Sequence, residues 1–127
     1  MSMQVFGHHV YEYRKGLRNL VLHTVRADEL HAAIHRLELA EIEYQTYPVK
    51  NTDRVNIFFG AKESVDVIRV IGKDDLNHYT PEEDFMLGTM LGYDRRQQCV
   101  RYLEQRVKWE KRQAQSTEKS DVLDRGC

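Results

Sequence analysis

Two pairs of residues, one of two histidines and one of a histidine with a glutamate, have the spacing that metal binding or proton transfer requires. His31 and His35 stand four residues apart in a stretch that is predicted to be helical, so their imidazoles would share one helix face. Two imidazoles on one face can ligate a transition metal, but a complete site needs further ligands, and the sequence indicates none clearly. A solvated polar face is the favoured interpretation, and we predict neither a metal site nor a cofactor.

The second pair, His8 and Glu12, lies one helical turn apart near the N-terminus. A histidine beside a carboxylate suits proton transfer or metal binding. No nucleophile or oxyanion donor can be assigned to work with it, so a structural role is favoured and an enzyme is not expected. His8, His9 and Tyr93 are nevertheless candidates for lining a small-molecule pocket between two copies of the chain.

The cysteines and glycines add no catalytic motif. Cys99 falls on an apolar stripe of the predicted last helix, which favours a buried, inert thiol, although Arg95 and Arg96 on the preceding turn would favour a thiolate. Cys127 ends a polar stretch, so the two cysteines do not form a disulfide framework. The glycines occur singly, without a phosphate-binding or dinucleotide-binding fingerprint.

The composition points to a cytoplasmic location. The N-terminal residues lack the basic and apolar regions of a signal peptide. No apolar run approaches the roughly 20 residues that a membrane span requires. A formal net charge of −1 also argues against a protein whose main task is to bind nucleic acid or a membrane surface.

The predicted last helix, residues 94–113, is basic and has apolar residues on two sides. Basic side chains outnumber acidic ones by four between Tyr93 and Gln113. One stripe consists of Cys99, Val100, Leu103 and Val107, and nearly opposite lie Tyr102, Arg106 and Trp109. Such a helix usually contacts both its own core and a partner. If the basic face is more than a solvated one, we expect it to bind an acidic protein through Arg95, Arg96, Arg106 and Trp109.

The elements that position these residues follow from hydrophobic periodicity. We predict helices at 3–15, 29–39, 80–91 and 94–113, and strands at 19–25, 42–49 and 54–59. Residues 61–71 fit a helix or a strand, and the helix is favoured. A chain of 127 residues fits one domain, assigned to residues 1–113. The polar residues 114–127 are predicted to be a disordered tail.

These elements predict an α+β fold with five helices and a three-stranded mixed sheet. The β-α-β-β-α order is part of a ferredoxin-like unit, with additional helices at both ends. A right-handed crossover makes the first two strands parallel, and the third runs antiparallel between or beside them. A sheet of three strands would have two open edges and one poorly covered face, so we expect a homodimer.

Several short motifs resemble those of a family of short bacterial proteins catalogued as a domain of unknown function. They are His8-His9-Val10-Tyr11-Glu12-Tyr13, Lys15-Gly16-Leu17-Arg18, Leu91-Gly92-Tyr93-Asp94-Arg95, Gln98-Cys99 and Arg101-Tyr102, and the likeness covers roughly residues 3–110. The resemblance implies three strands, five helices and a homodimer. It also implies genes next to flavodoxin genes, hence an accessory role near a small acidic flavoprotein.

Two functions are therefore carried forward. The leading one is a cytoplasmic, non-enzymatic homodimer that binds an acidic protein such as a flavodoxin. The alternative is a small-molecule sensor with its site at the dimer interface, or a weak histidine-based metal site.

Overall fold

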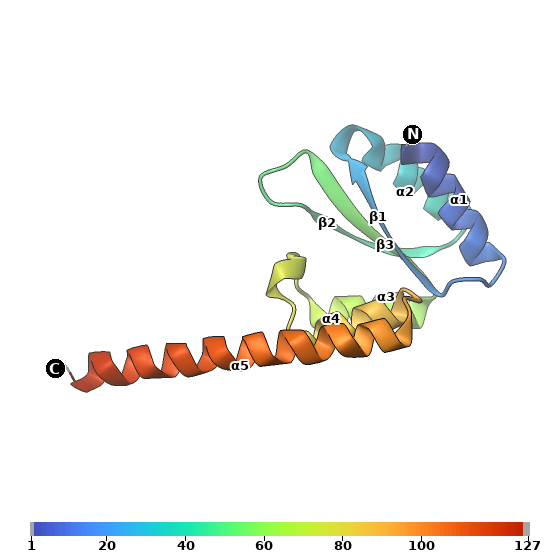
Figure 1. The fold of residues 1–127 in the computed structure, drawn as a ribbon. Helices are drawn as coiled ribbons and strands as arrows, with labels where there is room; N and C mark the ends of the chain where they lie inside the picture. The colour runs from blue at the N-terminus through green and yellow to red at the C-terminus, as the bar shows by residue number, and fades with distance from the viewer. Residues whose placement is uncertain (1, 126–127) are drawn as a thin grey trace.

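Three strands and five α-helices make up the part of the chain that the structure describes. The computed structural model describes residues 2–125, with side chains from residue 3 to residue 117. In chain order the elements are α1 (Ser2–Arg14), β1 (Leu20–Arg26), α2 (Leu30–Leu39), β2 (Glu43–Pro48), β3 (Arg54–Gly60), α3 (Lys62–Ile71), α4 (Pro81–Met90) and α5 (Arg95–Arg125) (Figure 1). Short 3-10 turns, η1 (Ala27–Glu29) and η2 (Leu76–His78), precede α2 and α4. The α+β class is confirmed, and residues 61–71 form the helix α3.

The sheet has the strand order β1-β3-β2, so the third strand in sequence lies in the middle. Phe59 of β3 pairs with Val21 of β1 on one side and with Tyr44 of β2 on the other. Both pairings are antiparallel. β1 and β2 run in the same direction, as predicted, but they do not pair. The sheet is therefore antiparallel throughout rather than mixed.

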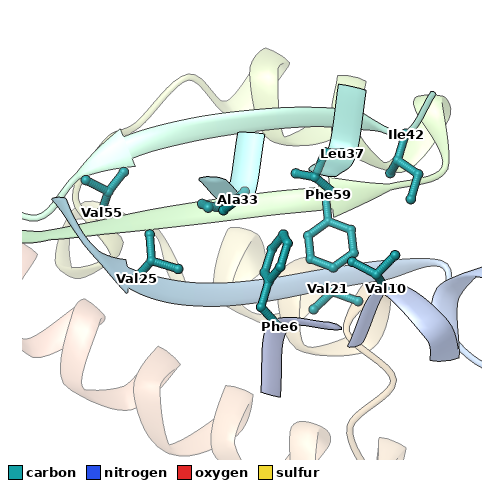
Figure 2. Packing of buried hydrophobic residues seen from close by; sticks show 10 residues of the cluster. Phe6, Val10, Val21, Val25, Ala33, Leu37, Ile42, Val55 and Phe59 are labelled. Carbon is teal, nitrogen blue, oxygen red and sulfur yellow. The ribbon is translucent and has the colours of Figure 1, made fainter. Parts of the chain in front are cut away.

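Each face of the sheet carries its own hydrophobic core. Because side chains alternate along a strand, Ile57 and Phe59 of β3 point to one face and Phe58 to the other. α1 and α2 cover the first face, where Phe6 packs against Phe59 with ring centroids 5.4 Å apart (Figure 2). α3 and α4 cover the second face through Val65, Ile68 and Leu87, together with Leu91 directly after α4. The expectation of one poorly covered face was wrong, because α3 and α4 both reach it.

A capping box marks the start of α4. Thr80 Oγ1 accepts a hydrogen bond from the backbone N–H of Glu83, and Glu83 Oε1 accepts one from the backbone N–H of Thr80. These two bonds satisfy N–H groups that have no partner inside the helix, and Pro81 supplies a suitable φ at the first helical position. This capping box fixes where α4 begins, and so which face α4 offers to α5.

The last helix is longer than predicted and packs against α4 rather than against the sheet. It was expected to end near Gln113 and continues to Arg125, about 46 Å at 1.5 Å per residue. Figure 1 shows it extending well beyond the rest of the chain. Residues 126 and 127 lie outside the described residues, and the disorder predicted for 114–127 stays a prediction. Within the described part, no helix is long and apolar enough to cross a membrane.

Candidate functional site

The face of α5 that meets α4 is the polar one. Gln98 is buried there, and a Cβ at Gly88 of α4 would overlap its side-chain amide, so the glycine makes room for it. Arg101 donates to both carboxylate oxygens of Asp84, at 2.8 and 3.0 Å. The Tyr102 hydroxyl donates to Glu82 at 2.8 Å, and this hydrogen bond raises the pKa of Tyr102. At this contact, α4 contributes acidic side chains and a glycine, and α5 contributes an amide, a guanidinium and a phenol.

The apolar stripe of α5 points to solvent. The exposed fractions are 51% for Val100, 62% for Leu103 and 52% for Val107, and Cys99 beside them is exposed as well. The interpretation of Cys99 as a buried core thiol was therefore wrong. The periodicity located the two faces of the helix correctly. The apolar face is nevertheless the exposed one, because α3 and α4 already cover the second face of the sheet. In the single chain, the three apolar side chains have been left uncovered.

The four residues predicted for a partner surface do not form one patch. Arg95 and Arg96 are exposed in the first turn of α5. Arg106 is neutralised by Glu82 at 3.4 Å and Glu110 at 3.2 Å. Trp109 lines a pocket of about 350 Å³ at the start of α4, together with Tyr79. Arg106 and Trp109 thus lie toward α4, whereas helical spacing places Arg96 on the side of the exposed stripe.

The three residues predicted for a ligand pocket are brought together in part. Nδ1 of His9 lies 3.1 Å from Nη1 of Arg18 and 3.3 Å from Oε1 of Glu12. Glu12 and Arg18, with Tyr93, line a pocket of about 470 Å³ between the end of α1 and the loop before α5. His9 therefore contacts two pocket residues, although it does not line the pocket itself. His8 lies outside this group, with 70% of its side chain exposed and 3.7 Å from Glu12.

The other histidine pair shows no site. His31 and His35 are both exposed on α2. Among the described residues, no group of three or more histidine, cysteine or acidic side chains is arranged to hold a metal ion. The arrangement around His9 places an imidazole beside a carboxylate and a guanidinium, groups that can bind a polar ligand.

A basic groove between α1 and α2 was missed at the sequence level. It has a volume of about 580 Å³ and is lined by Gly7, Val10, Tyr11, Arg14, Lys15, Arg36, Leu39 and Ala40. Two features could have indicated it. A glycine stands in the middle of a helix, and each of the two helices has an arginine in its last turn. Only the packing of α1 beside α2 shows that these features meet.

The comparisons agree with the resemblance at the level of the family. A search of curated proteins gave no match. The family model described as a protein of unknown function, DUF2023, matches residues 4–105, which include all of the fold except the first two residues of α1 and most of α5. The chain therefore belongs to the DUF2023 family.

Proposed function

We propose that this protein is a cytoplasmic, non-enzymatic homodimer that serves as an accessory module for an acidic protein partner. The observation that carries the proposal is the exposed stripe of Val100, Leu103 and Val107 on α5. It supports the homodimer directly, and the basic surfaces of the chain support the choice of an acidic partner.

The stripe has the geometry of a helix-helix contact. The three residues follow the alternating three- and four-residue spacing that places side chains along one side of a helix. They lie opposite the face that packs on α4, so they can be covered without disturbing the fold. Burying apolar area contributes about 25 cal/mol per Å². A second copy brings the same stripe, and a two-fold axis would bury both at once.

Light scattering of the full chain tests the homodimer. We expect a dimer for the unmodified protein and a monomer for Leu103→Glu, because a carboxylate would enter the buried stripe. The matched control is Gln113→Glu, which adds the same charge at an exposed position of α5 beyond the end of the stripe. A monomeric wild-type protein would overturn the homodimer, and a Leu103→Glu dimer would move the interface away from α5.

The acidic partner is proposed to be a protein such as a flavodoxin. Two basic surfaces support this choice: the exposed arginines Arg95 and Arg96 at the start of α5, and the groove between α1 and α2. Calorimetric titration with a purified flavodoxin at low and at raised salt tests the proposal. Attraction between exposed charges weakens with salt, so we expect the affinity to fall. Absence of binding at low salt would exclude flavodoxin, and a salt-independent affinity would exclude a charge-driven contact.

A small-molecule sensor is the second candidate, favoured by the pocket beside His9. Glu12, Arg18 and Tyr93 offer a carboxylate, a guanidinium and a phenol around one space of about 470 Å³. A ligand at 100 times its dissociation constant would stabilise the fold by about 2.7 kcal/mol. A thermal-shift screen with metabolites and nucleotides would detect such a ligand. A screen without any stabilising compound would count against the sensor.

A further inference from the structure

We propose that the groove between α1 and α2 is the docking site for an acidic segment of the partner protein, in which carboxylates are interspersed with apolar side chains. This inference rests on the proposed function and names the surface that carries it. Figure 1 shows α1 and α2 on the same side of the sheet. The groove is lined by residues of both helices.

Three cations converge on the groove from two helix ends. Arg14 closes α1, Lys15 follows it, and Arg36 lies in the last turn of α2. All three side chains are exposed, and within the described residues none of them forms an ion pair or hydrogen bond with an acid. Arg101 and Arg106 of α5 differ, because they are held by acids of their own chain. Attraction to an external carboxylate is therefore less compensated at the groove cations than at these two arginines.

Gly7 is what allows Arg36 to lie in the groove. The residue stands inside α1, where glycine is a poor helix former. A Cβ at position 7 would come within 2.9 Å of Nη1 and 3.0 Å of Nη2 of Arg36. The guanidinium thus rests directly against the backbone of α1, and any larger residue at position 7 would displace it. Glycine, an unfavourable helix residue, thus stands where the guanidinium of Arg36 meets the backbone of α1.

The groove also offers apolar surface to its occupant. Tyr11 and Leu39 are exposed beside the cations, at 55% and 73%, and Nζ of Lys15 lies 5.5 Å from the centre of the Tyr11 ring. A free inorganic anion would bind the cations and leave this apolar surface exposed to solvent. A peptide segment with acidic and apolar residues would satisfy both. The neutral charge balance of the whole chain also favours such a segment over nucleic acid.

Fluorescence anisotropy with a labelled peptide tests the docking site. The probe is a short peptide in which glutamate alternates with leucine, and a glutamine-leucine peptide is its control. We expect the Arg14→Gln, Lys15→Gln, Arg36→Gln variant to bind the acidic peptide at least about tenfold more weakly, at a fraction of a kcal/mol or more per lost charge pair. The matched variant Lys108→Gln, Lys111→Gln, Arg112→Gln removes three exposed charges from α5 and should keep the wild-type affinity.

Gly7→Ala provides a test that alters no charge. Alanine suits a helix, and only the flexible end of Arg36 has to move, so the variant should fold. We expect it to weaken peptide binding severalfold through displacement of Arg36. Equal losses of peptide affinity in both triple variants would overturn the inference. A loss of affinity in the α5 variant alone would also overturn it, although the proposal of an acidic partner would then remain. Binding of inorganic phosphate without binding of the peptide would also overturn it, as would unchanged binding by Gly7→Ala.

Discussion

Nδ1 of His9 lies 3.1 Å from Nη1 of Arg18, and the two residues meet because the chain reverses after α1. Gly16, with a φ of 77°, lets the helix end in a left-handed turn in which the N–H of Leu17 returns to the carbonyl of Glu12. Arg18 is thereby carried back alongside the last turns of α1. Gly16 thus ends α1 as its C-cap residue, and the meeting of His9 with Arg18 is the consequence.

The contact with Arg18 predicts the tautomer of His9. A guanidinium has only donors, so Nδ1 must accept, and the neutral ring should carry its proton on Nε2. Long-range ¹⁵N–¹H spectra of the imidazole distinguish the two tautomers. A proton on Nδ1 would instead mean that Glu12, 3.3 Å away, is the true partner. Arg18→Met is the informative variant, since removing the guanidinium should shift the tautomer population toward Nδ1–H.

The buried hydroxyl of Tyr79 predicts a stabilising substitution. Tyr79 is 8% exposed, and its hydroxyl has no hydrogen-bond partner among the described residues. A buried polar group without a partner destabilises a fold by about 1–3 kcal/mol. Tyr79→Phe should therefore raise the free energy of unfolding by about 1 kcal/mol in urea titrations. Tyr44→Phe is the control, because it loses a 2.7 Å bond to Glu38 and should be neutral or destabilising. A destabilised Tyr79→Phe would show that the hydroxyl has a partner after all.

The same residue predicts how stability changes at high pH. Burial, with smaller contributions from Tyr47 and Glu83, raises the pKa of Tyr79 to about 12 from the ordinary 10.0. A group whose pKa is raised on folding favours the folded state below its unfolded pKa, and this contribution is lost as pH rises through the folded value. Wild-type stability should therefore fall between pH 10 and 12. The stability of the Tyr79→Phe variant should fall less over this pH range. If stability had the same pH dependence in both proteins, the assignment to Tyr79 would be contradicted.

The fold could be predicted from local patterns, whereas the site depended on contacts between distant residues. The spacing of Thr80 and Glu83 predicts the start of α4, and the alternation of Val55, Ile57 and Phe59 predicts β3. The orientation of α5 could not be deduced in this way. Its apolar stripe looked like a core face, and only the acids and Gly88 of α4 show why the polar face is buried. Hydrophobic periodicity identifies the faces of a helix, but it does not show which face packs against the rest of the chain.

The position of Trp109 predicts that it has no part in the self-contact. Its side chain lies in the pocket at the start of α4, on the side away from Val100, Leu103 and Val107. Trp109→Ala should therefore leave the solution mass of the protein unchanged, in contrast to Leu103→Glu, and lower its stability modestly through lost packing. Light scattering and urea titration of the same samples separate the two effects. A monomeric Trp109→Ala protein would place the interface on the α4 side of α5.

The end of α5 predicts a boundary in amide exchange. All side chains from Glu110 to Thr117 are exposed, so past Trp109 the helix has little packing to hold it. An exposed helical segment without tertiary contacts is marginally stable, and its amides open at little free-energy cost. Hydrogen-exchange mass spectrometry should find strong protection over residues 98–109. It should find fast exchange over residues 114–125, which fall within the stretch predicted to be disordered. Protection that extends to residue 125 and disappears in Leu103→Glu would instead show that a second copy covers the whole helix.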